Sequence, residues 1–213
     1  MATLEQYITD LESMLSTVNL SGFFTPAMKI GWINQAGKRV YNFEKWPWLM
    51  HALKTQTELS EWYEQPARFK KGSIERITIG TGVEEKEYDI KSWNLYKDIR
   101  DNQGGQRASA LLGSQFFIYP TPEIINEEIG IYGQLKWVTL TSNSDEAITN
   151  SEDYDEAIVK LAFASALKKE RRFSEANSEV EEVIQEILPR LYQQETKQAP
   201  QGYIGTQTST RWQ

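Results

Sequence analysis

The stretch NFEKWPWLMHAL, residues 42–53, marks the point where the character of the chain changes. It places tryptophans on both sides of Pro47 and contains His51, the only histidine. Apolar residues before it recur at helical spacing, whereas several segments after it alternate as strands do. Because a residue that precedes proline is disfavoured in a helix, we expect the helix to end near Phe43, ahead of Trp46. We interpret the stretch as a structural junction anchored by indole rings, and not as a binding site.

Two helices are predicted before this junction. The first carries an apolar stripe at Leu4, Ile8, Leu11 and Leu15. The second begins at Thr25-Pro26, because threonine caps helix N-termini and proline fits the first helical position. The small residues Ala36 and Gly37 in the second helix predict the close approach of another backbone.

The segment after the junction is expected to be rich in strands. Its sequence is enriched in isoleucine, threonine and aromatic residues, which favour a pleated, half-buried surface. A short helix capped by Ser92 interrupts it. The predicted strands lie in SIERITIG (73–80), EEKEYDI (84–90), RASALLG (107–113), SQFFIYP (114–120) and IYGQLKWVTLT (131–141).

Helices return near the C-terminal end. One is expected to start at Ser151, and the next follows Phe173 with an apolar stripe in which Pro189 should kink or end the helix. The sequence therefore predicts an α+β fold: a helical bundle built from N- and C-terminal helix pairs, a central β-rich insertion and an extended C-terminal arm. The corresponding ranges are 1–45 with 151–195, then 46–150, then 196–213.

Composition narrows the classes of function. The chain has 213 residues, a formal net charge of -7 and no cysteine, so disulfides and thiolate zinc sites are excluded. The excess of acidic over basic residues argues against a nucleic-acid-binding protein, because such proteins are typically basic. The first residues lack the pattern of a signal peptide, and no segment approaches the roughly twenty apolar residues of a membrane span. We expect synthesis and folding in a cytoplasm-like compartment.

No catalytic, cofactor-binding or metal-binding residues are predicted. A serine triad would need His51 and a G-x-S-x-G elbow that the sequence lacks. One alternative is a metal-dependent nuclease that uses Glu87, Asp89 and Lys91, because alternating strand residues share a face. Another alternative is a carbohydrate- or small-ligand-binding module that uses exposed tryptophans. The basic run at residues 168–172 ends a helix, where cations suit the negative end of the helix dipole; a subunit or phosphate contact is the other interpretation.

The order of elements resembles the head-to-tail adaptor (connector) proteins of tailed bacteriophages, of the podovirus tail tubular protein A or gatekeeper type. Three features carry the resemblance. The first is a second helix that ends in AGKRVYNFEKWPWL (36–49), and the second is an aromatic strand before proline, SQFFIYPTPE (114–123), that leads into YGQLKWVTLT (132–141). The third is EDYDEAIVKLAFASALKKERRF (152–173), followed by an acidic helix and PQGYIG (200–205).

This resemblance implies a structural virion protein of the neck and tail, with no cofactor and no membrane. Such adaptors form a homo-oligomeric ring, commonly of twelve copies, which docks under the portal protein and joins it to a downstream tail or nozzle protein. DNA passes through the lumen without specific contacts. The C-terminal arm inserts against the portal. The residues that we expect to contact the portal or another partner are Tyr203, Ile204, Arg211, Trp212, Lys168, Lys169, Arg171 and Arg172.

Overall fold

The computed structural model describes residues 2–20, 22–102, 105–149 and 151–198. The chain forms two compact units, with boundaries between Trp48 and Leu49 and between Leu135 and Lys136. The first unit, called here the helical unit, is assembled from both flanks of the chain. The second, called the β unit, is the continuous segment between the two boundaries.

The helical unit contains the predicted helices, and their ends follow the capping residues. Helix α1 (Leu4–Thr17) is preceded by Thr3, whose side chain accepts a hydrogen bond from the backbone of Gln6 in a capping box. Helix α2 (Pro26–Tyr41) has Thr25 as its N-cap and proline at its first position, as predicted. Helix α4 (Glu152–Lys169) begins after Ser151.

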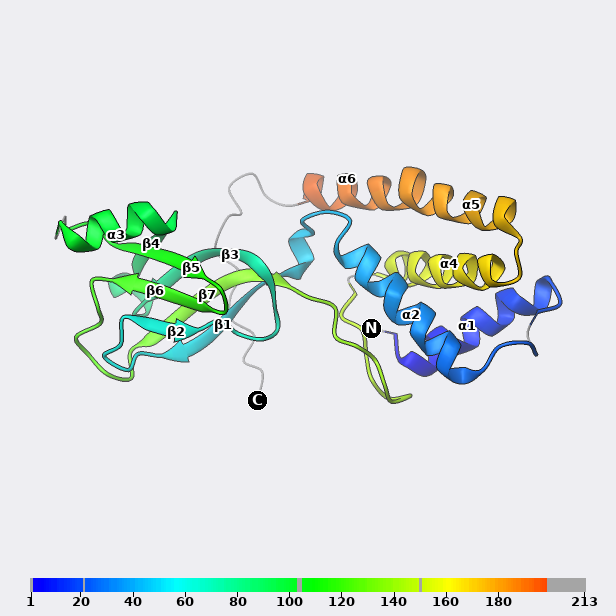
Figure 1. Ribbon diagram of the computed structural model, residues 1–213, viewed down its shortest axis with the longest axis horizontal. Coiled ribbons are helices and arrows are strands. Elements are labelled where there is room, and N and C mark those ends of the chain that lie inside the picture. The colour runs from blue at the N-terminus through cyan, green and yellow to red at the C-terminus, as the bar shows by residue number, and fades with distance from the viewer. Residues whose placement is uncertain (1, 21, 103–104, 150, 199–213) are drawn as a thin grey trace. The chain divides into compact units, whose positions relative to one another are not determined.

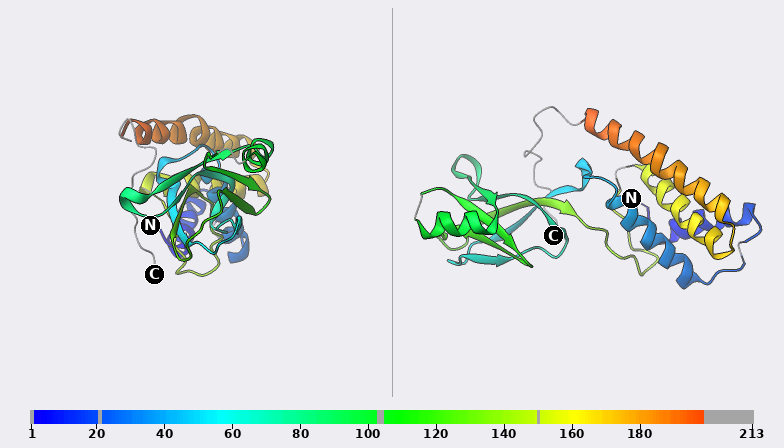
Figure 2. Two further views of the ribbon diagram at one scale, coloured as in Figure 1. Left: turned by 90° about the vertical axis from the view of Figure 1, so that its left-hand side faces the viewer. Right: turned by 45° about the horizontal axis from the view of Figure 1, so that its top comes forward.

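Helix α4 is the centre of the helical unit. Ten of its eighteen residues are buried, so it has no single apolar face and must be covered from several sides. Helices α1 and α2 pack on it from one side, and the last helical run packs on it from another (Figures 1 and 2). The small alanines along α4 allow these neighbours to approach closely, because they add little volume between the helix axes.

The last helical run passes through Pro189 without ending. It consists of α5 (Phe173–Glu181), a π-helical segment η3 (Glu182–Ile187) and α6 (Leu188–Gln198). A proline in a regular α-helix lacks its N–H donor and crowds the carbonyl four residues earlier, here that of Gln185. The wider π turn directly before the proline lets the helix continue. Of the two predicted effects of Pro189, a kink or an end, the end does not occur, because the helical run continues to Gln198.

Buried polar contacts attach residues 136–141 to helix α2. Asn34, in the middle of α2, accepts hydrogen bonds from Trp137 Nε1 at 2.9 Å and from the backbone N–H of Leu140 at 2.8 Å. Its amide nitrogen donates to the carbonyls of Leu140 and Ile30. The indole of Trp137 covers Gly37, where an added Cβ would lie only 2.4 Å from a ring atom. The small residue thus admits an indole ring, and not a backbone as predicted.

The junction stretch forms an aromatic cluster in the helical unit. Trp46 is fully buried, and its Nε1 donates to the carbonyl of Val40 at 2.7 Å. Its ring meets Tyr154 of α4 and Tyr192 of α6 edge to face, with centroids 5.1 and 5.6 Å away. Helix α2 ends at Tyr41, and a short 3₁₀ turn, η1 (Pro47–Leu49), follows. The predicted anchoring role of Trp46 is confirmed by these contacts.

The β unit is a seven-stranded sheet that curls into a half-barrel, in the order β1-β7-β3-β4-β5-β6-β2 (Figure 1). All neighbouring strands pair antiparallel except β4 and β5, which pair in parallel. Strand β3 is bulged where its register against β7 shifts, which adds curvature. The strands are β1 (Met50–Gln56), β2 (Trp62–Glu64), β3 (Phe69–Ile79), β4 (Lys86–Lys91), β5 (Ala108–Leu112), β6 (Gln115–Tyr119) and β7 (Glu128–Leu135).

Helix α3 (Trp93–Asp101) connects the parallel strands β4 and β5 and packs on the sheet. Its single buried residue, Tyr96, is fully enclosed with Ala108 and Ala110 of β5. Trp93 stacks on Tyr96, with ring centroids 5.7 Å apart. Ser92 occupies the N-cap position as predicted, although its side chain makes no capping hydrogen bond. This connection is the crossover that a parallel strand pair requires.

The predicted fold class is wrong in its proportions. The seven-stranded sheet is a major element of this α+β fold, so the chain is not a helical bundle with a β-rich insertion. The described residues form five helices beside the sheet, if α5, η3 and α6 are counted as one. Strands β1 and β2 escaped prediction because neither carries a clean apolar alternation. Strand β7 ends at Leu135, six residues earlier than predicted. Of the predicted arm 196–213, residues 196–198 belong to α6, and the rest lies outside the described residues.

Candidate partner-binding surfaces

The first candidate surface is the turn between α4 and α5, residues 168–173, called here the basic turn. Arg171 has a positive φ of 62°, which reverses the chain direction. The backbone N–H groups of Arg171 and Arg172 donate to the carbonyls of Lys168 and Leu167, at 3.1 and 2.9 Å. These bonds satisfy carbonyls at the end of α4 and hold the turn in one shape.

The basic turn combines free cations with an exposed aromatic ring. Lys168, Lys169 and Arg171 are exposed and form no ion pair within the described part of the chain. Arg172 differs because it pairs with Glu175, and that hydrogen bond raises the pKa of its guanidinium. The side chain of Phe173 is 58% exposed. The structure thus brings together four of the predicted partner-contact residues, three of which are available to a partner.

The other four predicted contact residues cannot be placed in this way. Tyr203, Ile204, Arg211 and Trp212 lie outside the described residues.

The second candidate surface lies on the β unit, where the loop from β1 to β2 meets the loop from β6 to β7 (Figure 1). The buried residue Thr57 joins them. Its backbone N–H donates to the carbonyl of Glu127 at 2.9 Å, and its own carbonyl accepts from the N–H of Asn126 at 3.0 Å. Its hydroxyl donates to the carbonyl of Ile124 and accepts from the N–H of Glu127. Four hydrogen bonds from one residue therefore fix the two loops to each other.

The joined loops expose apolar side chains among carboxylates. Leu59, Ile124 and Ile125 are 57%, 59% and 57% exposed. Leu59 also has a positive φ of 34°, an unfavourable backbone conformation for leucine. The two loops with their flanking strand residues, 57–65 and 120–128, carry six glutamates and no lysine or arginine. We call this region the acidic loop surface; it comprises the exposed residues Glu58, Leu59, Glu123, Ile124 and Ile125 and the half-buried Glu127.

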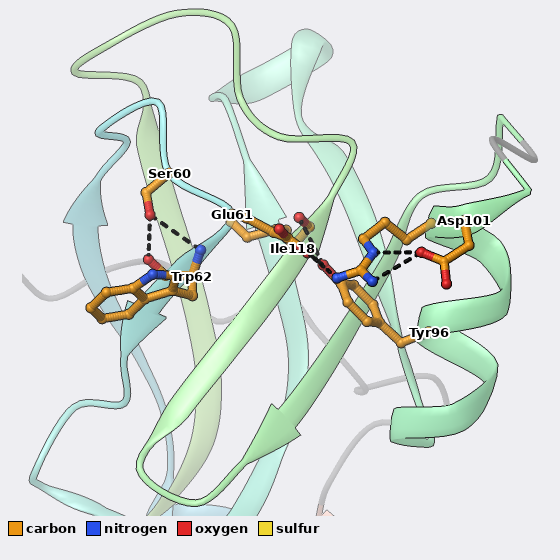
Figure 3. Close-up of polar contacts among 7 residues, drawn as sticks. Ser60, Glu61, Trp62, Tyr96, Asp101 and Ile118 are labelled. Carbon is orange, nitrogen blue, oxygen red and sulfur yellow. Dashed lines mark hydrogen bonds and ion pairs between the residues drawn. The ribbon is translucent and has the colours of Figure 1, made fainter.

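Helix α3 holds the loop from β1 to β2, which carries part of the acidic loop surface, through hydrogen bonds to Glu61. Figure 3 shows Tyr96 reaching from α3 toward Glu61, to which its hydroxyl donates at 3.0 Å. Arg100 donates to Glu61 at 3.1 Å and to Asp101 at 2.9 Å. Burial, and then the hydrogen bond to Glu61, raise the pKa of Tyr96, so its phenol remains a donor. The N–H of Ile118 donates to the carbonyl of Glu61, which ties the loop to β6 as well.

The residues of the predicted nuclease alternative form ion pairs with neighbours. Glu87 pairs with Arg76 at 3.3 Å, and Asp89 pairs with Lys91 at 3.2 Å, all at the surface of β3 and β4. Among the described residues, no group of three or more histidine, aspartate or glutamate side chains is arranged to hold a metal ion. His51 lies half-buried in strand β1, a position that the sequence did not predict to be a strand.

The tryptophans do not form a common exposed platform in the described part of the chain. Trp46 and Trp137 are buried, whereas Trp32, Trp48 and Trp93 are half-buried. Among the described tryptophans, Trp62 is the most accessible, at 47% exposure; its backbone is held by the hydroxyl of Ser60 (Figure 3). Of these rings, Trp62 is the best placed to stack on a sugar.

Sequence reasoning found the basic turn, because a run of cations is visible in one short segment. It missed the acidic loop surface, because Thr57 and Ile124 are 67 positions apart in the sequence. The available signal was the isoleucine pair in TPEIINEE (121–128). Apolar residues in a polar loop need a reason to be exposed.

No protein-family model matches the chain, and no curated protein matches it. None of the helices in the described ranges is long and apolar enough to cross a membrane.

Proposed function

We propose that the chain is a structural subunit of a virus particle: a head-to-tail adaptor whose copies form a ring under the portal and connect it to the next tail component. The observation that carries the proposal is the pair of exposed, hydrogen-bonded surfaces, the basic turn and the acidic loop surface. Each presents apolar surface beside an excess of charge of one sign, basic at the turn despite Glu170 and acidic at the loops, a composition that suits contact with another protein.

The features of the sequence that resemble the adaptor family support the same function. In such a ring every subunit touches two neighbours as well as the partner rings above and below, so several separate contact surfaces are needed on one small chain. Two preorganised surfaces on different units meet part of this requirement. The net charge of -7 suits a channel through which DNA passes, because an acidic wall does not retain a polyanion.

The test is association with a portal ring. The purified chain, mixed with the portal protein of the same virus, should co-sediment with the portal, and electron microscopy should show an added ring on one face. A truncation after Gln198 should weaken this attachment and leave the helical circular dichroism signal unchanged, because the described helices are complete at that residue. A chain that stays monomeric in the presence of the portal would contradict the proposal.

A ligand-binding function makes a different prediction for the same protein. If Trp62 served as a sugar-stacking ring, a panel of glycans would quench part of the tryptophan fluorescence, and Trp62→Ala would abolish that quenching. The adaptor proposal expects no saturable quenching by any glycan in the panel.

A further inference from the structure

We propose that the basic turn of one copy docks on the acidic loop surface of the next copy. The inference deepens the proposed function and rests on it, because it names the contact that would join neighbouring subunits in the ring. The two surfaces differ, so the contact is head to tail. A head-to-tail contact closes into a ring when its rotation allows closure.

The first reason is that the surfaces match in chemistry. The basic turn exposes one large apolar side chain, Phe173, beside the free cations Lys168, Lys169 and Arg171, which outnumber the one exposed carboxylate of the turn, Glu170. The acidic loop surface exposes three aliphatic side chains beside the carboxylates of Glu58, Glu123 and Glu127, which form no ion pair within the described residues. An aromatic anchor among aliphatic side chains, with opposite charges around it, is a common arrangement at protein interfaces.

The second reason is that both surfaces are already held in shape. Backbone hydrogen bonds fix the basic turn at the end of α4, and Thr57 fixes the two loops of the acidic loop surface. Little conformational entropy is then lost when they meet, so more of the contact energy remains for association. The positive φ of Leu59 is explained in the same way, since it directs an exposed leucine into the contact.

A second copy is the occupant favoured by charge. A nucleic acid could bind the basic turn but would be repelled by the acidic loop surface, and it would leave the exposed aliphatic side chains uncovered. Another copy of the chain satisfies both surfaces at once. Each copy then has one surface of each kind engaged, so no subunit of a closed ring leaves either of these two surfaces uncovered.

Cysteine cross-linking tests the contact directly, because the chain contains no cysteine of its own. One preparation carries Ile124→Cys and another carries Phe173→Cys. When they are mixed and treated with a short bismaleimide, a covalent dimer should form; since each copy carries only one cysteine, a cross-link can join only two copies. The control pairs Phe173→Cys with Val83→Cys, which is fully exposed on the turn η2 (Gly82–Glu84). Equal yields from the two mixtures would overturn the inference.

Charge reversal supplies a second test that does not depend on distance. Glu58→Lys/Glu123→Lys and Lys168→Glu/Lys169→Glu change only exposed side chains, so both variants should fold. Each alone should weaken self-association about tenfold or more, since like charges then face each other. A mixture of the two should recover association, because alternating copies restore opposite charges at every contact. Failure of the mixture to recover would refute the pairing.

These outcomes separate the inference from the proposed function. If wild-type protein forms a ring on the portal and the charge variants form it equally well, the adaptor function stands and the proposed contact is wrong. If the mixed variants recover association but no form binds the portal, the contact stands and the adaptor function is wrong.

Discussion

Replacing Asn34 with alanine should sharply destabilise the helical unit. Asn34 lies in the middle of α2 and is buried, with only 7% of its surface exposed. Its side chain makes four hydrogen bonds, three of them to the segment that follows the β unit: Trp137 Nε1, the N–H of Leu140 and the carbonyl of Leu140. The alanine variant removes the partner of all three groups without removing the groups themselves.

The magnitude follows from the number of groups left without this partner. A buried donor or acceptor that loses its hydrogen bond costs about 1–3 kcal/mol. Three such groups give roughly 3–6 kcal/mol, since local relaxation reduces the full sum. The total stability of a typical domain is about 5–15 kcal/mol, so this one substitution should remove a large part of it.

Urea denaturation followed by far-ultraviolet circular dichroism measures the effect. Gln35→Ala is the matched control, because Gln35 is the next residue of the same helix and is exposed. The control should lie within about 0.5 kcal/mol of wild type. Asn34→Asp should fall between wild type and alanine at low pH, where a protonated carboxyl can still donate to Leu140. A loss below about 1 kcal/mol for Asn34→Ala would refute the argument that these bonds fasten the segment to α2.

Three further outcomes are expected. Gly37→Ala should lower stability by about 1–3 kcal/mol, because the new Cβ would overlap the indole of Trp137. Gly31→Ala is the control in the same helix: it has open space and should raise stability by up to about 1 kcal/mol. Equal effects of the two substitutions in urea denaturation would contradict this. Trp46→Ala should cost about 3–5 kcal/mol by the same assay, and a folded variant of wild-type stability would exclude the anchoring role. Burial raises the pKa of Asp155 in the folded protein above its ordinary value of 3.8, so the stability that protonated Asp155 contributes is lost as the pH rises from 3.8 through the pKa of the folded state. Asp155→Asn should therefore flatten the dependence of the melting temperature on pH in this range. An unchanged slope would assign the dependence to other groups.

The helices could be predicted because their signals are local. Thr25-Pro26 begins α2, Ser151 precedes α4, and Leu4, Leu11 and Leu15 form the buried stripe of α1. Each signal lies within one or two turns of the element that it describes, so periodicity and capping were sufficient. The strands β5 and β6 were predicted for the same reason, and Gly113 closes the hairpin between them with a positive φ.

The features that escaped prediction depend on distant partners. Strand β1 is held by its pairing with β7, so its own sequence carries little strand signal. Asn34 appears as an ordinary polar helix residue until Trp137 lies beside it, more than a hundred positions later. Pro189 was expected to kink or end the helix, and the π turn before it could not be anticipated from residue types alone.

The two candidate surfaces differ in the same way: one is local in the sequence, and the other depends on residues that are far apart in it. The basic turn is contiguous, so its cations could be identified from the sequence. The acidic loop surface exists only because Thr57 joins two loops, and neither loop attracted attention alone. The fold class was misjudged for a related reason: two strands were missed, and the sheet was therefore underestimated.

The arrangement of the two units has a consequence for the order of folding. The β unit is one continuous segment, and its strands are complete once Leu135 has left the ribosome. Helices α1 and α2 are synthesised before the β unit, whereas α4, the helix that covers their apolar stripes, is synthesised after it. The N-terminal helices must therefore wait with their apolar stripes uncovered while the sheet assembles. Limited proteolysis of ribosome-bound chains that have emerged only as far as Leu135 should find the β unit protected and α1 cleaved, and the reverse result would exclude this sequence of events.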